Sequence, residues 1–335
     1  MIKEAINKIV EGNYLTQDEA EDVMNEIMNG ESTPSQIASF ITALRMRGET
    51  VDEITGCAKV MREKVTKIRT NADLLVDTCG TGGDSSHTFN ISTISALVAA
   101  GAGLSIAKHG NRAVSSQSGS ADVLKALGVN IEADADKVAK CIDEIGIGFL
   151  FAPLWHPAMK HAIGPRREIG IRTIFNILGP LTNPAGAQAQ VLGVYNVKLT
   201  ELIANVLKNL GSRHVFVVHG SDGLDEITTT GKTYVTELKD NQLLSYTIEP
   251  EDFGISRANK TDLIGGSAEE NARIALKILE GEKGPKRDIV LLNASAAIVA
   301  GGKTSDIKEG IKLAEESIDS GRAMQKLELL RKLSN

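Results

Sequence analysis

The sequence predicts an α/β protein, in which a small N-terminal all-helical domain precedes a larger α/β domain with a mainly parallel central sheet. Two patterns predict this arrangement. Apolar residues recur at helical spacing up to Arg69, whereas short β-like runs alternate with helices from Leu74 onwards. The chain has 335 residues, of which 42% are hydrophobic, so it is long enough for two domains. We expect a helical domain over residues 1–70 and an α/β domain over residues 71–335.

Local signals mark the helices of the first domain. Apolar residues recur at helical spacing from Ile2, and three capping boxes follow at Thr16–Glu19, Thr33–Gln36 and Thr50–Glu53. Pro34 occupies the first helical position of the second box, where its missing N–H costs nothing. These signals predict four helices before residue 70.

The rest of the chain alternates between strands and helices. The β-like runs are LLVDT, LSIA, IGFLFA, QVLGVY and HVFVV, and they predict a largely parallel sheet. KTYVTEL and LLSYTI then predict an antiparallel hairpin, and residues 267–333 return to helices. Residues 156–184 carry prolines and helix-like spacing but no strand, so we expect this crossing segment to return to the helical domain.

Composition excludes several classes of protein. The net charge of −6 creates no overall field that favours nucleic acid or an anionic membrane. The sequence contains three cysteines, Cys57, Cys79 and Cys141. An odd number of cysteines without metal-ligand spacing is typical of a protein in a reducing cytoplasm. No apolar run approaches the roughly eighteen residues of a membrane span, so we expect a cytoplasmic protein without signal peptide or membrane helix.

The densest motif is DTCGTGGDSSHTFNIS, residues 77–92, directly after a predicted strand. Its glycines allow backbone N–H groups to approach an anion, and hydroxyls at the following helix start add donors. The spacing matches neither a P-loop nor G-x-G-x-x-G, and Asp84 would repel a bare phosphate. A metal ion or a ribose hydroxyl must therefore share such a site; the alternative is a glycine-rich turn without a ligand.

A second polar motif, residues 108–128, follows the next strand and leads into a helix near Ser120. Because ligands bind at the ends of parallel strands, the two motifs are expected to face one site. The alternative is a polar loop in which Ser120 caps the helix. The histidines show no metal-ligand spacing, and we interpret His109 as a loop residue that contributes shape. The donors, which suit several phosphate oxygens, are Lys108, Asn111, Arg112, Ser115, Ser116, Ser118 and Ser120.

Two further motifs carry charge. HGSDGLDEITTTG, residues 219–231, places Asp225 next to Glu226 on a predicted loop, where both carboxylates can reach Mg²⁺; the alternative is a solvated acidic turn. GPRREIGIRT holds Arg166, Arg167 and Arg172, any of which can pair with a carboxylate through two parallel hydrogen bonds. We expect one of them to bind an acidic substrate and the others to pair with Glu168 or other acids.

Five long motifs in order make the chain resemble the anthranilate phosphoribosyltransferases of tryptophan biosynthesis over nearly its whole length. They are GTGGD (80–84), NIST (90–93), KHGNRAVSSQSGSADVL (108–124), HPAMKHAIGPRREIGIRTIFNILGPLTNP (156–184) and DGLDEI (222–227). The resemblance implies a fold like the nucleoside phosphorylases and phosphoribosyltransferases, and a homodimer paired through the helical domains. It implies transfer of phosphoribosyl from 5-phosphoribosyl 1-diphosphate to the anthranilate amine, with release of diphosphate and with two Mg²⁺ ions.

The resemblance also implies the site, residue by residue. Anthranilate would contact Gly80, Asn111 and Arg166, and the metal would contact Ser92, Asp225 and Glu226. No protein nucleophile is implied, and no general base is assigned, because the reaction depends on positioning and charge stabilisation. The implied donor site comprises Gly80, Gly82, Gly83, Asp84, Thr88, Asn90, Ile91, Ser92, Thr93, Lys108, His109, Gly110, Asn111, Arg112, Ala113, Val114, Ser115, Ser116 and Ser120.

Two other functions are less consistent with the motifs. A pyrimidine nucleoside phosphorylase of related fold would carry KHSTGG and a later Ser-Lys-Lys signature, and this sequence contains neither. A nucleic-acid-binding relative would show a basic groove and eroded donor motifs, whereas this chain is acidic and its motifs are intact.

Overall fold

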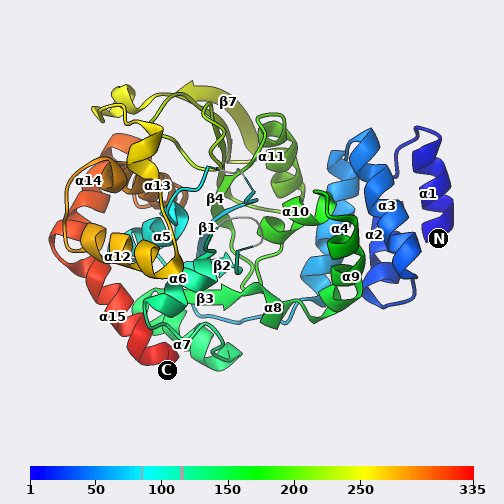
Figure 1. Ribbon diagram of the computed structural model, residues 1–335, viewed down its shortest axis with the longest axis horizontal. Helices are drawn as coiled ribbons and strands as arrows, with labels where there is room; N and C mark the ends of the chain where they lie inside the picture. The colour runs from blue at the N-terminus through cyan, green and yellow to red at the C-terminus, as the bar shows by residue number, and fades with distance from the viewer. Residues whose placement is uncertain (84–85, 114–116) are drawn as a thin grey trace.

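The computed structural model of the protein describes residues 1–83, 86–113 and 117–335. The chain begins with a helical bundle of α1 (Ile2–Val10), α2 (Gln17–Met28), α3 (Pro34–Arg47) and α4 (Val51–Lys64) (Figure 1). The last three helices begin at the predicted capping boxes. In each box the threonine hydroxyl accepts a hydrogen bond from the backbone N–H three residues later, so local sequence determines these starts.

A single seven-stranded sheet, in the order β3-β2-β1-β4-β5-β6-β7, forms the centre of the rest of the chain. The first five strands in this order are parallel, and β6 and β7 extend the sheet as the predicted antiparallel hairpin. The strands are β1 (Val76–Gly80), β2 (Ile106–Gly110), β3 (Ile147–Phe151), β4 (Ala189–Gly193), β5 (His214–Gly220), β6 (Thr233–Lys239) and β7 (Gln242–Ile248).

One strand ends later than the sequence pattern predicts. The run LSIA ends at residue 107, but β2 continues to Gly110, so the prediction of His109 as a loop residue is wrong. The reason is pairing: Lys108, His109 and Gly110 lie in register with Phe149, Leu150 and Phe151 of β3. Ladder partners on β3 thus keep this polar sequence extended, although its own pattern resembles a loop.

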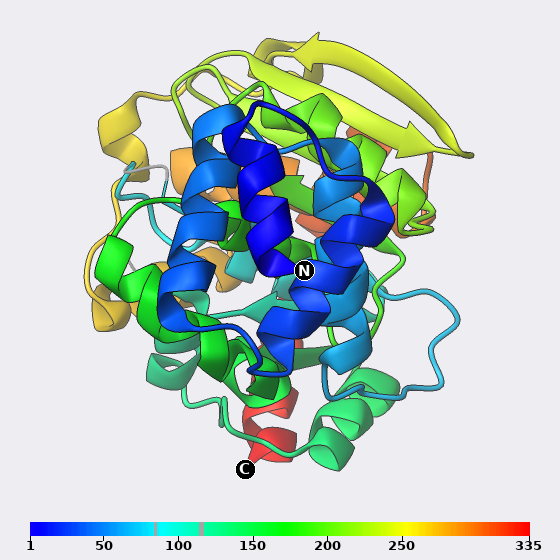
Figure 2. The same cartoon turned by 90° about the vertical axis from the view of Figure 1, so that its right-hand side faces the viewer.

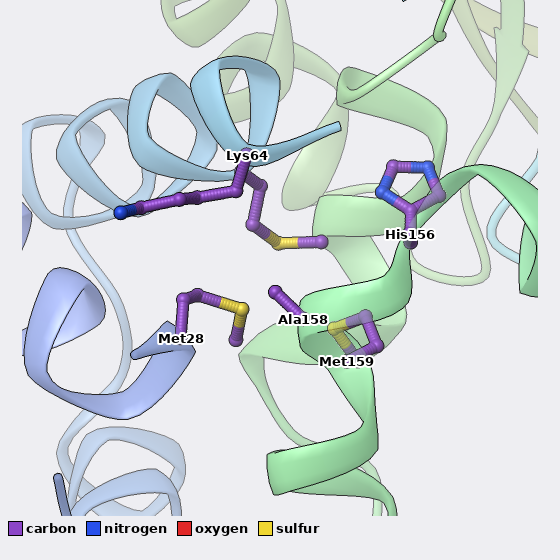
Figure 3. Close-up of a pocket in the computed structure, with 6 residues that line it drawn as sticks. Met28, Lys64, His156, Ala158 and Met159 are labelled. Atoms are coloured by element: carbon purple, nitrogen blue, oxygen red, sulfur yellow. The ribbon is translucent and has the colours of Figure 1, made fainter. Parts of the chain in front are cut away.

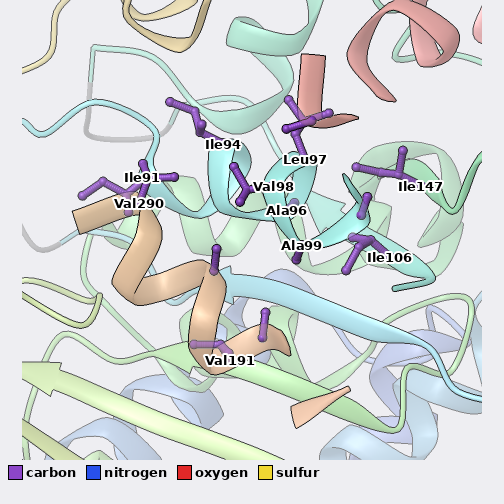
Figure 4. Packing of buried hydrophobic residues seen from close by; sticks show 14 of the residues in the cluster. Ile91, Ile94, Ala96, Leu97, Val98, Ala99, Ile106, Ile147, Val191 and Val290 are labelled. Atoms are coloured by element: carbon purple, nitrogen blue, oxygen red, sulfur yellow. The ribbon is translucent and has the colours of Figure 1, made fainter. Parts of the chain in front are cut away.

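Helices cover both faces of the sheet (Figures 1 and 2). Alternate strand residues face opposite clusters: Val191 packs in the cluster with α5 and α13, and Leu192 packs in the cluster with α11 and the helical bundle. Figure 4 shows the first cluster around α5. The helices of this part are α5 (Ile91–Gly101), α6 (Ser120–Ala126), α7 (Ala135–Ile145), α11 (Leu199–Asn209), α12 (Ala268–Leu279), α13 (Pro285–Ala300), α14 (Ile307–Asp319) and α15 (Arg322–Ser334), with 3-10 turns η3 (Pro250–Phe253) and η4 (Lys260–Leu263).

The crossing segment runs from the sheet back to the bundle. It follows the short helix α8 (Ala152–Trp155) and contains η1 (Pro157–Met159), α9 (Lys160–Ile169), α10 (Ile174–Leu178) and η2 (Gly179–Leu181). Helix α9 lies against α2 and α3, and α10 lies against α3 and α4. Ile174 and Phe175 belong to the same buried cluster as Phe40 and Leu44 of α3. The segment therefore packs on the bundle through apolar side chains.

The three cysteines are free and buried. Among the helices that the structure describes, none has the length and apolar character needed to cross a membrane.

Candidate active site

The predicted site residues gather at one edge of the sheet. Strands β1 and β4 are neighbours, but the connection after β1 leads to β2 on one side and the connection after β4 leads to β5 on the opposite side. The loops after β1, β2 and β5 all start at the carboxyl ends of parallel strands. In open α/β sheets this switch point is where ligands bind.

The acidic loop lies directly against the glycine motif. Asp225 Oδ2 accepts a 2.7 Å hydrogen bond from the backbone N–H of Gly82. Glu226 Oε1 accepts a 3.1 Å bond from the backbone N–H of Ser92, in the first turn of α5. Both carboxylates are half-buried, unlike those of a fully solvated acidic turn. The adjacent acids thus bridge the glycine loop and the start of α5.

The close approach of the acidic loop to the sheet requires glycine at the ends of β1 and β4. A Cβ atom at Gly80 would lie 2.4 Å from Asp225 Oδ2, and one at Gly193 would lie 1.5 Å from the Asp225 carbonyl oxygen. Any side chain at Gly193 would therefore displace the acidic loop. None of the sequence motifs includes Gly193, although a glycine near the end of the run QVLGVY is a signal for close backbone approach.

The start of α5 presents polar groups to the same edge. Ser92 is the second residue of the helix, whose N-cap is Asn90, so Ser92 is not the cap. Thr93 Oγ1 is buried and lacks a hydrogen-bond partner within the ranges that the structure describes. Ile91 packs in the core, and Thr88 forms an isolated bridge with Ile264. A buried hydroxyl without a partner is costly, so Thr93 suits a ligand that supplies one.

The second polar loop is tied to the helix that follows it. Helix α6 begins at Ser120 with Gly119 as N-cap, so the alternative in which Ser120 caps the helix is wrong. The side chain of Asp122 stabilises this helix start, because its Oδ2 accepts hydrogen bonds from the backbone N–H groups of Gly119 (2.9 Å) and Ala113 (3.0 Å). The Ser120 hydroxyl instead donates to the Asn111 carbonyl at 3.3 Å.

Two cations of the second polar motif, Lys108 at the end of β2 and Arg112 in the loop after it, have partners in the protein. Lys108 is buried, and its Nζ donates to the carbonyl of Thr78 on β1. Arg112 lies 3.6 Å from Asp122 and 3.9 Å from Glu132, with its guanidinium 5.6 Å from the Phe151 ring. Asp84, Val114, Ser115 and Ser116 lie outside the described residues.

A buried carboxyl connects β1 and β2 beneath the loops. Asp77 accepts from the backbone N–H of His109 at 3.1 Å and from Asn183 Nδ2 at 2.8 Å. Burial raises the pKa of Asp77, while the charge of Lys108 and these hydrogen bonds oppose the shift. The ends of both strands are therefore held together by polar contacts.

A histidine pair connects β2 to the crossing segment. The Nε2 atoms of His109 and His156 lie 3.3 Å apart, so one ring donates and the other accepts. Burial lowers the pKa of His109 to about 3 and that of His156 to about 4, which leaves both imidazoles neutral near pH 7. His156 also lines a cavity of about 10 Å³ beside Met28 and Met159 (Figure 3), which holds at most one water molecule.

The three candidate arginines differ in surroundings. Arg166, on α9, is half-buried with its guanidinium 5.1 Å from the Phe175 ring, and burial lowers its pKa. Arg167 is exposed. Arg172 stacks 4.5 Å from the Tyr195 ring and donates to the carbonyl of Gly83 in the glycine loop. The expected pairing with Glu168 is wrong for the described residues, because no ion pair between them joins these arginines to an acid.

Hydrogen bonds among described residues thus unite Gly82, Ser92, Asp225 and Glu226, and a second set unites Asn90 with the loop after β2. They do not connect Arg166 with Gly80 or Asn111. The structure also reveals contacts that the motifs did not indicate: Arg172 reaches Gly83, and Asn271 and Asn293 of the C-terminal helices reach the site loops.

Two family models match the chain in succession. The helical bundle domain of a glycosyl transferase family matches residues 3–65, and the a/b domain of a glycosyl transferase family matches residues 72–324.

Individual relatives match over nearly the whole length. Anthranilate phosphoribosyltransferase of Acetivibrio thermocellus is 60% identical and covers 100% of this chain and 97% of its own. The crystal structure of the Thermus thermophilus enzyme has a TM-score of 0.94 at 46% identity, covering 98% of this chain and 99% of that chain. The Saccharomyces cerevisiae enzyme, solved in complex with PRPP and Mg, has a TM-score of 0.90 at 30% identity, covering 99% and 97%. The yeast enzyme was also solved with 4-fluoroanthranilate. The chain belongs to the anthranilate phosphoribosyltransferase family.

Proposed function

We propose that this chain transfers the phosphoribosyl group of 5-phosphoribosyl 1-diphosphate to the amine of anthranilate. The products are N-(5-phosphoribosyl)anthranilate and diphosphate, within tryptophan biosynthesis. One observation carries the proposal: Asp225 and Glu226 contact the N–H groups of Gly82 and Ser92, which places acids, glycine loop and helix start at one point. Diphosphate and metal together need that combination.

The side chains at this point fit Mg²⁺. Carboxylate and hydroxyl oxygens are its preferred protein ligands, so Asp225, Glu226 and Ser92 would hold it, and we propose two ions with the donor. Bound Mg²⁺ would supply positive charge that stabilises the departing diphosphate. The buried hydroxyl of Thr93, which has no hydrogen-bond partner among the described residues, would donate to the donor's oxygens.

Anthranilate would bind between the donor and the crossing segment. Arg166 is half-buried, so it would hold the anthranilate carboxylate through charge-assisted hydrogen bonds. Gly80 and Asn111 would contact the same substrate from the sheet side. An aromatic amine is nucleophilic when neutral, so positioning and charge stabilisation suffice without a protein nucleophile.

We also propose the organisation of the whole molecule. Residues 1–70, joined by residues 156–184, form the helical domain, and residues 71–335 form the donor-binding domain; the apolar packing of α9 and α10 on the bundle supports this division. Exposed Met1, Val10, Tyr14 and Met46 on the bundle support a homodimer through this domain, which light scattering would test as twice the mass of one chain. The three free cysteines support a cytoplasmic location.

The decisive experiment follows the loss of anthranilate fluorescence in the presence of the donor and Mg²⁺. We expect substrate consumption that requires both and that stops when EDTA is added. A pyrimidine nucleoside with inorganic phosphate serves as the control reaction and should give no product. Phosphorolysis of the nucleoside, with anthranilate left unconsumed, would instead favour the nucleoside phosphorylase function.

A further inference from the structure

Two asparagines on neighbouring C-terminal helices contact the loops of the site. Asn271 lies on α12 and Asn293 lies on α13, and each side chain is only 2% exposed. Neither residue belongs to a motif of the donor or metal site. A buried carboxamide must satisfy two donors and an acceptor, so its partners define what it holds in place.

Asn271 connects the loop before α5 with the loop before α6. Its Nδ2 donates to Asn90 Oδ1 at 2.9 Å and to Ser118 Oγ at 2.8 Å. Its Oδ1 accepts from the backbone N–H of Gly266 at 2.8 Å, which anchors the side chain from behind. Asn90 in turn donates to the Ser118 carbonyl at 3.2 Å. One side chain therefore sets the spacing between both polar motifs.

Asn293 holds the acidic loop instead. Its Oδ1 accepts from the backbone N–H of Ile227 at 2.9 Å, and its Nδ2 donates to the carbonyl of the same residue at 2.8 Å. The remaining amide hydrogen goes to Ile289 within its own helix, at 2.9 Å. Because Ile227 directly follows Glu226, this two-point contact fixes the backbone that carries the acidic pair.

We propose that Asn271 and Asn293 are positioning residues with separate tasks: Asn271 sets the donor loops, and Asn293 sets the acidic loop for the metal. This inference rests on the proposed function of the site. Neither asparagine contacts a substrate group; each acts through the loop that it holds. Outer partners of this kind typically change ligand affinity by about ten- to a hundredfold when they are altered.

The test uses the same substitution at both positions. Asn271→Asp and Asn293→Asp keep the shape and an acceptor oxygen but replace the N–H donors with an ionisable carboxyl, at equal burial. Asn271→Ser and Asn293→Ser are measured beside them, because they remove the carboxamide without adding charge. Calorimetry would measure donor affinity at saturating Mg²⁺, and Mn²⁺ titration followed by electron paramagnetic resonance would measure metal affinity. Ser295→Ala is the control, since among the described residues this buried hydroxyl donates within its own helix, to the Leu292 carbonyl.

We expect opposite patterns. Asn271→Asp should weaken the donor about tenfold and change Mn²⁺ affinity less than about twofold, and Asn293→Asp should do the reverse. The inference would be overturned if each variant changed donor affinity and metal affinity equally, or if neither variant changed either affinity. The proposed function would still stand in that case, because the wild type would be active. If the wild type itself did not bind the donor, the proposed function would be overturned as well. Where an Asp variant melts below the assay temperature, the Ser variant at that position gives the same comparison.

Discussion

The two sides of the site are built in different ways. On the sheet side, loops are joined by polar contacts between distant parts of the chain, such as Gly82 with Asp225, 143 residues apart. On the other side, α9 and α10 of the crossing segment pack on the bundle through buried apolar residues. The sides meet at the Arg172–Gly83 and His109–His156 contacts. Under the proposed function, the sheet side would bind the donor and the metal, and the crossing segment would bind the acceptor.

The acidic loop gives the largest expected effect on the sheet side. Asp225→Asn combined with Glu226→Gln should lower turnover at moderate Mg²⁺ by about a thousandfold or more, because the diphosphate then lacks its counter-cations. Excess metal should restore only part of the rate. The measurement is rate against Mg²⁺ concentration for both proteins.

Asp222→Asn is the matched control for this double variant. Asp222 binds Thr228 and Thr230 within the same loop, and an amide oxygen can still accept from these hydroxyls. The Mg²⁺ dependence should therefore stay near that of the wild type. If the curves of rate against Mg²⁺ concentration overlapped for the double variant and the wild type, Asp225 and Glu226 would not be metal ligands.

The crossing segment is tested by Arg166→Ala. Loss of a charge-assisted bond should lower kcat/KM for anthranilate about ten- to a hundredfold, while donor affinity changes much less. Arg167→Ala provides the neighbouring control, since Arg167 is exposed. Michaelis constants for both substrates decide the matter. If Arg166→Ala leaves the anthranilate constant unchanged and Arg172→Ala raises it, the wrong arginine has been assigned.

Arg172 connects the two sides of the site, because it lies in the crossing segment and donates a hydrogen bond to the glycine loop. Its contact with the Gly83 carbonyl predicts that Arg172→Ala weakens donor binding about fivefold, with a smaller effect on anthranilate. Arg172→Lys should not recover wild-type affinity, because an ammonium cannot stack on Tyr195 as the planar guanidinium does. Full recovery by lysine, measured by calorimetry with the donor, would show that charge alone matters here.

The same contrast explains what the sequence could predict. The bundle helices follow from capping boxes that lie within four residues, such as Thr16–Glu19. The strand at His109 and the anchors Asn271 and Asn293 depend on partners far along the chain, and no local pattern marks them. The motifs located the acidic pair and glycine loop, but only the fold shows that Gly193 makes room for Asp225.

The smallest expected effect concerns stability on the crossing-segment side. Burial lowers the pKa of His156 from 6.5 to about 4, so the unfolded chain takes up a proton at a higher pH than the folded one. The free energy of unfolding must therefore fall as pH drops from about 6.5 towards 4. His156→Gln removes this titration while its amide can still bond to His109.

Between pH 7 and pH 5 the wild type should lose about 2 kcal/mol more stability than His156→Gln does. Urea unfolding at both pH values measures the difference. Met159→Leu, a change of similar volume in a residue that lines the same small cavity, should keep the wild-type pH dependence because it removes no ionisable group. Parallel pH dependences for the wild type and His156→Gln would mean that this imidazole is protonated in the folded protein as readily as in the unfolded chain. The His109–His156 contact would then not be a contact between two neutral imidazoles.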